Sequence, residues 1–193
     1  MTTIYTIGHS TRTHDELFGL LARHGVTRLV DVRSYPGSRR CPQHGLQPLV
    51  ERAEQEGMGF HWMLDLGGRR NKQPGADERN GAWRNASFRN YADYAQSDRF
   101  SIALAKLEDM ANLSPVAYMC SEAVPWRCHR TIISDALVMR GWDVQHIMDN
   151  GLKPHKLGAW GPKPSDHNGI PFYPDGQLSL FPTWHDFEIS TAV

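Results

Sequence analysis

The chain has 193 residues, of which 40% are hydrophobic and 22% charged, and its 21 basic and 21 acidic side chains give a formal net charge of zero. These values exclude a collagen-like fibre, an intrinsically disordered chain and a uniformly basic coat for nucleic acid. They fit a globular protein of a size that buries one core and not two full-sized ones.

Strand-like and helix-like segments alternate along most of the chain. β-Branched and aromatic runs bounded by turn residues predict strands, and apolar residues at helical spacing predict helices. The first helix has the clearest start, because Thr13 and Glu16 form a capping box. In chain order we expect a strand at 3–8, a helix from the cap at Thr13 to the stop at Gly25, a strand at 27–32, a helix at 46–57, a strand at 59–64, helices at 88–97 and 99–112, a strand at 115–120, a helix at 129–141 and a strand at 143–148.

This alternation indicates a mainly parallel sheet with helices on both faces. We therefore expect a single Rossmann-like α/β domain over residues 1–157. Residues 65–87 have no period and are rich in Gly, Asn, Arg and Pro, and a loop of that length in a compact domain is usually functional or disordered. Sequence from Asn150 onward also lacks a period, so residues 158–193 are expected to form an irregular wrapping segment and a tail.

Cysteine usage and the N-terminus bear on the cellular compartment. Three cysteines are an odd number and do not indicate a disulfide scaffold. The N-terminal MTTIYTIGHS lacks the charged and apolar regions of a signal peptide, and no apolar run approaches the roughly 18 residues of a membrane span. We expect a cytoplasmic protein with reduced thiols and no membrane contact.

Polar and titratable side chains follow every predicted strand. In open α/β sheets, ligands bind beyond the carboxyl ends of the strands, so these residues are expected to line one cleft. They are His9 and Ser10 after the first strand, Asp31, Arg33, Arg39 and Arg40 after the second, Asp65, Arg69 and Arg70 after the third, Cys120, Glu122, Cys128, His129 and Arg130 after the fourth, and Asp149 and His155 after the last. The stretch MCSEAVPWRCHR (119–130) is the richest part, and three chemical interpretations compete there.

The first interpretation is a phosphatase-like or sulfur-transfer loop that begins at Cys120 and is closed by Arg127. The loop between them contains no glycine that would let the backbone curl around a phosphate group. Glu122 would also repel a dianion. This interpretation is therefore disfavoured.

The second interpretation is a zinc or iron site built on Cys120, Cys128 and His129, with His9 or His155 as a further ligand. The residue types suit either metal. The C-x7-C-H spacing matches neither the common short-spaced zinc fingers nor the C-x-x-C-H of haem attachment.

The third interpretation, which we favour, makes Glu122 a general acid or base with His129 as its partner. Cys128 lies at the start of a predicted helix, where the macrodipole lowers a thiol pKa. Cys128, His9 and Asp31 are therefore further catalytic candidates, whereas Cys120 fits a buried strand residue. The substrate-binding candidates are Arg33, Arg39, Arg69, Arg84 and Arg130, which would hold phosphate or carboxylate, and Trp126, on which a base would stack.

A short apolar cluster lies in the tail, within DGQLSLF (175–181). Apolar residues in a flexible segment indicate docking into a groove, either of a partner or of the chain's own domain. Five of these residues resemble the peptide by which bacterial polymerases and repair proteins bind the sliding clamp. They are Gln177, Leu178, Ser179, Leu180 and Phe181.

Several longer motifs resemble one bacterial family, the domain of unknown function 488, over residues 4 to about 157. The resemblance implies a Rossmann-like domain and the same strand-end residues, and it implies no reaction. Cys41 departs from the family pattern, in which relatives tend to carry an aromatic residue there, and this argues against a metal role for Cys41. The motifs are IYTIGHS (4–10), LVDVRSYPGSRR (29–40), LGGRR (66–70), NGAWRN (80–85), FRNYADY (88–94), MCSEAVPWRCHR (119–130) and VQHIMDNGLKPH (144–155).

These observations lead us to expect an enzyme of hydrolase or lyase type that acts on nucleic acid or a nucleotide-like anion in DNA metabolism or repair. Two alternatives stay open. One is a non-catalytic module that holds a nucleotide or nucleic-acid end through the same arginines and tryptophan. The other is a metal-binding or thiol redox protein.

Overall fold

The computed structural model describes residues 2–37, 41–74 and 78–176. The predictions that fall outside these ranges are the anion-binding role of Arg39, the place of Arg40 in the cleft and the clamp-binding peptide at residues 177–181. All of these stay predictions.

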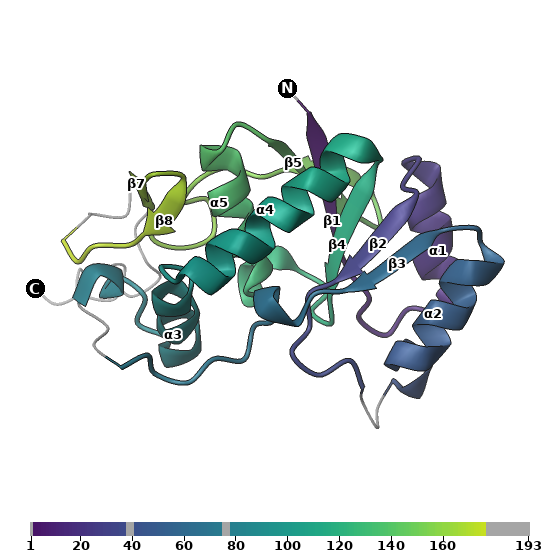
Figure 1. Cartoon of the computed structure of the whole chain (residues 1–193), viewed down its shortest axis with the longest axis horizontal. Coiled ribbons are helices and arrows are strands. Elements are labelled where there is room, and N and C mark those ends of the chain that lie inside the picture. Colours follow the sequence, from purple (N-terminus) through teal and green to yellow (C-terminus); the bar gives the residue numbers. More distant parts are fainter. Residues whose placement is uncertain (1, 38–40, 75–77, 177–193) are drawn as a thin grey trace, which may run out of the picture.

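A six-stranded sheet in the order β3-β2-β4-β1-β5-β6 forms the centre of the fold (Figure 1). Strands β1 to β5 pair in parallel, and the edge strand β6 pairs antiparallel with β5. Every strand predicted from the sequence is present, which confirms the mainly parallel, Rossmann-like α/β fold. The strands are β1 (Thr3–Gly8), β2 (Arg28–Asp31), β3 (Gly59–Trp62), β4 (Val116–Cys120), β5 (Asp143–Met148) and β6 (Gly151–Pro154).

Helices cover both faces of the sheet. The first begins with the predicted capping box, in which Thr13 and Glu16 each accept a hydrogen bond from the other's backbone N–H. The helices α1 (His14–Arg23) and α2 (Leu46–Gln55) lie on one face, and α3 (Ala86–Tyr94), α4 (Asp98–Leu113) and α5 (Arg130–Met139) lie on the other. Within the described ranges, no helix is both long and apolar enough to cross a membrane.

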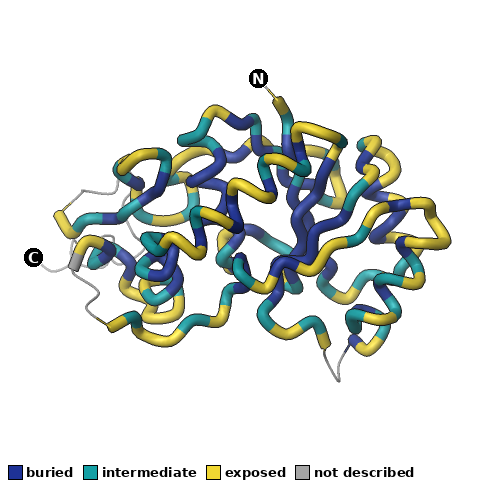
Figure 2. The backbone as a smooth tube through the Cα atoms, in the orientation of Figure 1, coloured by how far each residue is buried: buried dark blue, intermediate teal, exposed yellow. Residues whose placement is uncertain are grey.

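Each face of the sheet packs against its own apolar core. In β4, Ala117 and Met119 belong to the core under α1 and α2, whereas Val116, Tyr118 and Cys120 belong to the core under α3, α4 and α5. Figure 2 shows how completely these central strands are buried. A strand that is buried on both faces reads as a continuous apolar run, which is why this strand is recognisable in the sequence.

The chain reverses its direction across the sheet between β1 and β4. The path from β1 through β2 to β3 uses α1 and α2 on one face, and the path from β4 to β5 uses α5 on the opposite face. The loops that leave the adjacent strands β1 and β4 therefore diverge to opposite faces. Such a reversal point, beyond the strand carboxyl ends, is where open α/β sheets hold their ligands.

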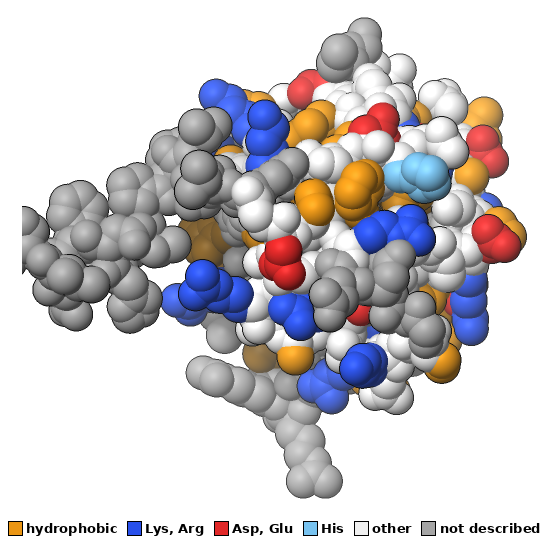
Figure 3. All heavy atoms as spheres, turned by 90° about the vertical axis from the view of Figure 1, so that its left-hand side faces the viewer, with side chains coloured by type: hydrophobic (Ala, Val, Ile, Leu, Met, Phe, Trp, Pro, Cys, Tyr) orange, Lys and Arg blue, Asp and Glu red, His pale blue; other side chains and the backbone are white. Residues whose placement is uncertain are grey.

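The prediction that the sequence is irregular from Asn150 onward is wrong for part of that segment. Besides β6, strands β7 (Ser165–His167) and β8 (Ile170–Phe172) form an antiparallel hairpin. Strands of three or four residues are too short to show a period, and they are held by pairing and by Ile170 and Tyr173, which enter the core under α4 and α5. Figure 3 shows basic side chains scattered over the face that contains this hairpin and α3, with acidic side chains between them.

A buried chain of hydrogen bonds ties this C-terminal segment to α5 and β5. The Tyr173 hydroxyl donates to Asp135 Oδ2 at 2.7 Å, and Nε2 of His155 lies 2.9 Å from Asp135 Oδ1. Nδ1 of His155 lies 3.0 Å from Nε2 of His146, which is fully buried. Because an ionised Asp135 only accepts, His155 carries its hydrogen on Nε2 and accepts at Nδ1 from a neutral His146.

We expect acid to destabilise the protein through His146. Its pKa is lowered to about 2, first by burial and then by electrostatic interactions with His155, Arg130 and Lys153. Between that value and an unfolded pKa of about 6.5, the unfolded state binds a proton that the folded state does not, so the free energy of unfolding falls by roughly 1.4 kcal/mol for each pH unit below 6.5. Urea unfolding of His146→Gln between pH 6.5 and 5 should show a shallower fall than the parent protein.

The pKa of Asp135 is raised by burial and acts in the opposite direction, but both proteins carry Asp135, so the difference between their slopes reports on His146. Equal slopes in the two proteins would contradict the buried neutral state of His146.

Candidate functional site

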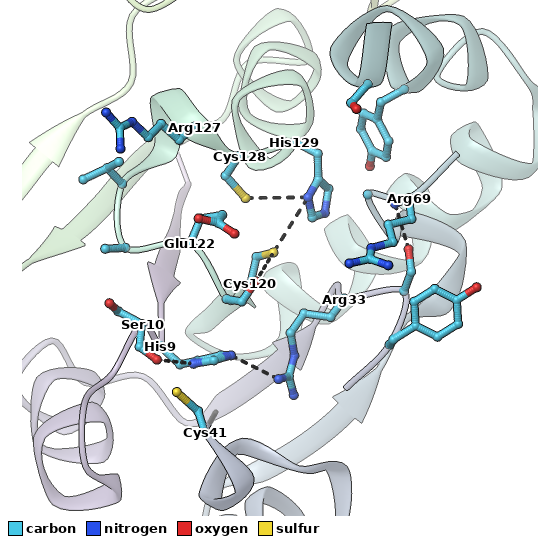
Figure 4. Close-up of a pocket in the computed structure, with 18 of the residues that line it drawn as sticks. His9, Ser10, Arg33, Cys41, Arg69, Cys120, Glu122, Arg127, Cys128 and His129 are labelled. Carbon is cyan, nitrogen blue, oxygen red and sulfur yellow. Dashed lines mark hydrogen bonds between the residues drawn. The ribbon is translucent and has the colours of Figure 1, made fainter. Parts of the chain in front are cut away.

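A cavity of about 850 Å³ opens at the carboxyl ends of the parallel strands. The residues predicted after the last strand lie elsewhere, because Asp149 pairs with Arg12 at 2.7 Å and His155 belongs to the buried chain with Asp135. The predicted cleft is therefore built at four strand ends. Its walls include the loops after β1, β2, β3 and β4, at residues 9–11, 33–35, 68–69, 120–124 and 127–129 (Figure 4).

Two cysteines and a histidine meet on one wall of the cavity. Cys120 ends β4, and Cys128 and His129 directly precede α5. Nδ1 of His129 lies 3.8 Å from Sγ of Cys120 and 3.6 Å from Sγ of Cys128 (Figure 4). Ligand atoms of all three residues lie within 4.8 Å of one another. The structure thus brings together the three residues of the metal interpretation.

The surroundings of His129 determine which ring nitrogen faces the sulfur atoms. Nε2 lies 3.0 Å from the carbonyl oxygen of Val32, which can only accept, so Nε2 carries the hydrogen. A neutral His129 therefore presents a lone pair at Nδ1 toward the two sulfur atoms. Gly68 packs so closely on the ring that a Cβ there would lie 2.3 Å from Nδ1, and Tyr91 contacts the ring edge-on.

The two thiols have opposite pKa shifts. Burial opposes the Cys128 thiolate, but a hydrogen bond from Cys120 and the nearby Arg130 outweigh burial and lower the pKa of Cys128 to about 6. The hydrogen bond to Cys128, burial and the negative charge of Cys128 raise the pKa of Cys120 to about 12. The sequence predicts a lowered pKa at Cys128 because of the helix macrodipole. In the structure, the causes of the lowered pKa are Cys120 and Arg130.

Arg130 supports this wall from inside the protein. It is 1% exposed, and its guanidinium donates to Thr6 Oγ1 at 3.1 Å, to the Glu122 carbonyl at 2.5 Å and to Cys128 Sγ at 3.4 Å. These contacts fix the loop that follows β4. The guanidinium is therefore occupied by protein groups, in contrast to the substrate-binding position predicted from the sequence.

Arg33 and Asp31 form a buried ion pair at the end of β2. Nε and Nη2 of Arg33 donate to Asp31 at 2.8 and 2.5 Å, so the carboxylate of this predicted catalytic residue is already engaged. Nη1 of Arg33 donates to Nε2 of His9 at 3.1 Å, and Nδ1 of His9 donates to the Ser10 carbonyl. Burial, followed by His44 and Arg33, lowers the pKa of His9 to about 3, so His9 is neutral at physiological pH.

Within the described part of the chain, the exposed charged side chains that line the cavity are Glu122, Arg69 and Arg127. Arg69 lies over the ring of Tyr35, with 5.7 Å between the guanidinium carbon and the ring centre. Arg127 ends the short 3₁₀ helix Pro125–Arg127. Figure 4 shows the two arginines on different sides of the cavity. Two exposed cations at the rim favour an anionic ligand.

The cavity brings together most of the predicted site residues and leaves out others. Arg84 is exposed and lies outside the lining, and Trp126 also lies outside it, beside Trp160 with ring centres 5.5 Å apart. Asp31 and Arg130 are buried behind the walls. The predicted residues that line the cavity are His9, Ser10, Arg33, Arg69, Cys120, Glu122, Cys128 and His129.

Two residues that line the cavity were not among the favoured site residues of the sequence analysis, which considered Arg127 only as the closing residue of the disfavoured phosphatase-like loop and gave Gly68 no role. Arg127 lies in the same stretch as Glu122 and Cys128, so its position was an available signal. Gly68 is needed for the close approach of the His129 ring, and a glycine pair in the loop after β3 was its only signal.

The fold and the cavity define a Rossmann-like α/β protein with a candidate site at the reversal point of its sheet. Residues 13–137 match the family model of the domain of unknown function DUF488, and the chain belongs to this family. This confirms the resemblance carried by the sequence motifs over residues 13–137. Searches of curated proteins and of solved structures found no match. The family description names no reaction, so a function must be argued from the site.

Proposed function

We propose that this protein is an enzyme that acts on a phosphate-bearing, nucleotide-like or nucleic-acid substrate held in the cavity. The observation that carries the proposal is that, among the described residues, the exposed carboxylate of Glu122 and the exposed guanidinium groups of Arg69 and Arg127 line the same cavity at the strand carboxyl ends. Arginine binds phosphate oxygens in bidentate fashion, so the two arginines would position the substrate.

Glu122 is the group we assign to proton transfer. A carboxylate close to a bound phosphate group costs binding energy unless it exchanges a proton with the substrate, which favours an acid or base role over a binding role. His129 is less suited to be its partner than the sequence indicated, because its Nε2 faces Val32 and its Nδ1 faces the two sulfur atoms.

The tail extends the proposal to DNA. Residues 177–181 resemble a clamp-binding peptide, and binding to a sliding clamp would bring the cavity to replicating or repaired DNA. This part rests on the sequence motif alone.

Substitution of the two arginines should weaken the binding of phosphate ligands. We expect Arg69→Gln and Arg127→Gln each to raise the Kd of nucleoside diphosphates or a 5′-phosphorylated oligonucleotide about tenfold, the loss of one charge-assisted contact. Glu122→Gln should keep the binding and lower any turnover by roughly 10²- to 10⁴-fold. Titration calorimetry and product analysis measure the two effects separately.

Arg84→Gln is the matched control, because Arg84 is an exposed arginine outside the cavity lining. Affinities that do not change in the Arg69 and Arg127 variants would contradict the anion site. Arginine-dependent binding without turnover of any tested phosphate ester would favour a non-catalytic binding module instead.

A further inference from the structure

We propose that Cys120, Cys128 and His129 bind a single zinc-type metal ion in the wall of the cavity, with a fourth coordination position open to the ligand. The inference deepens the proposed function, on which the chemical role of the ion rests. The binding of the ion itself is measured without turnover.

The spacing of the donor atoms fits such an ion. In a tetrahedral zinc site with zinc–sulfur bonds of about 2.3 Å and zinc–nitrogen bonds of about 2.0 Å, a ligating nitrogen and sulfur lie about 3.5 Å apart. Nδ1 of His129 lies 3.6 Å from Cys128 Sγ and 3.8 Å from Cys120 Sγ. Both nitrogen–sulfur distances are thus close to those around a bound zinc ion, and all three donor atoms lie within 4.8 Å of one another.

The outer contacts of the cluster also have the pattern of a metal site. Histidine ligands commonly donate their second ring N–H to a carbonyl, which fixes the ring and leaves the other nitrogen for the metal. His129 does this through Val32, and Gly68 allows the ring its position. Arg130 donates to Cys128 Sγ at 3.4 Å, the kind of hydrogen bond that stabilises a ligating thiolate.

The number of donors and their location indicate a catalytic rather than a structural kind of site. Structural zinc sites are closed by four protein ligands, whereas catalytic sites have three and keep one position for water or substrate. Cys120, Cys128 and His129 all line the cavity that Glu122 and Arg127 also line. A bound ion would supply Lewis-acid polarisation of a phosphate oxygen or of water in that cavity.

The test uses the full-length chain, expressed with added zinc and purified without chelator under reducing conditions. Elemental analysis should find about one ion per chain, the stoichiometry of a mononuclear site. After exchange with Co²⁺, the spectrum should show thiolate-to-cobalt charge transfer and the intense d–d bands of tetrahedral coordination. Cys120→Ser, Cys128→Ser and His129→Ala should each lose the ion, and Gly68→Ala should weaken Co²⁺ binding about ten- to hundredfold by displacing the His129 ring.

Cys41→Ser is the matched control, because Cys41 is also a buried cysteine in the cavity lining and should not be needed for the ion. If a variant of Cys120, Cys128 or His129 does not fold, thiol labelling of the parent protein tests whether the two cysteines bind the ion. Cys120 and Cys128 should react only after chelation, while the reactivity of Cys41 should not depend on the chelator.

A folded parent protein without stoichiometric metal and without a thiolate–cobalt band would overturn the inference. A disulfide bond between Cys120 and Cys128 that persists under reducing conditions would also overturn the inference. Neither result would affect anion binding through Arg69 and Arg127, so failure of the metal site and failure of the proposed function are distinguishable.

Discussion

Gly8→Ala should lower the free energy of unfolding by about 3 kcal/mol or more, at the upper end of the range for overpacked sites. A Cβ on Gly8 would lie 1.8 Å from the carbonyl oxygen of Glu122 and 2.9 Å from Nη2 of Arg130. The clash is with backbone on the loop after β4, so neither a side-chain rotation nor a small shift relieves it. Urea unfolding monitored by circular dichroism measures the change.

Gly19→Ala is the control for this substitution. Gly19 lies in α1, is exposed, and a Cβ there would meet nothing within 4 Å. Alanine at this helix position should stabilise the protein by about 0.5–1 kcal/mol. A small cost for Gly8→Ala, similar in size to that of an ordinary surface substitution, would show that the loop after β4 does not pack on β1 as described.

Asp31→Asn should cost about 3–5 kcal/mol of stability, because it leaves the Arg33 guanidinium buried without its counter-charge. Both side chains are almost fully buried, with exposures of 0% for Asp31 and 6% for Arg33. Asp31 Oδ1 also accepts a hydrogen bond from the Arg33 backbone N–H at 3.0 Å. The carboxylate therefore holds the backbone after β2 in addition to neutralising the Arg33 side chain. Chemical denaturation at pH 7 measures the effect.

The double variant Asp31→Leu, Arg33→Met separates the cost of an unpaired charge from the value of the pair. Replacing both members of a buried ion pair with apolar residues of similar size is often neutral or stabilising, so the double variant should be more stable than Asp31→Asn alone. Arg99→Gln, which breaks an exposed pair with Asp65, should cost no more than about 1 kcal/mol. A double variant less stable than the single one would contradict the explanation by an uncompensated charge.

The parallel part of the fold could be predicted from the sequence because its signals are local. β4 is a continuous apolar run, and α1 has a complete capping box at Thr13 and Glu16. By contrast, β6, β7 and β8 depend on pairing and on contacts of Ile170 and Tyr173 with distant helices. No local pattern encodes such contacts, and these strands were missed.

The position of the candidate site could be predicted from the sequence, but the directions of its side chains could not. The rule that ligands bind at strand carboxyl ends placed Glu122, Cys128 and His129 correctly at the cavity. The direction of the Arg130 side chain depends on Thr6, more than a hundred residues earlier, and on the Glu122 carbonyl. Likewise, the 3₁₀ turn Pro125–Arg127 lies between Cys120 and Cys128, and sequence spacing alone does not show that the two thiols meet.

The position of β4 between β1 and β2 has a consequence for synthesis on the ribosome. β1 pairs only with β4 and β5 in the described sheet, and β2 pairs with β3 and β4. When the first half of the chain has emerged, β1 and β2 face a gap that only residues 116–120 can fill. We therefore expect the nascent chain to expose both edges of β1 and one edge of β2 until β4 is made, and the candidate site to be completed only after β4 and residues 127–129 have followed.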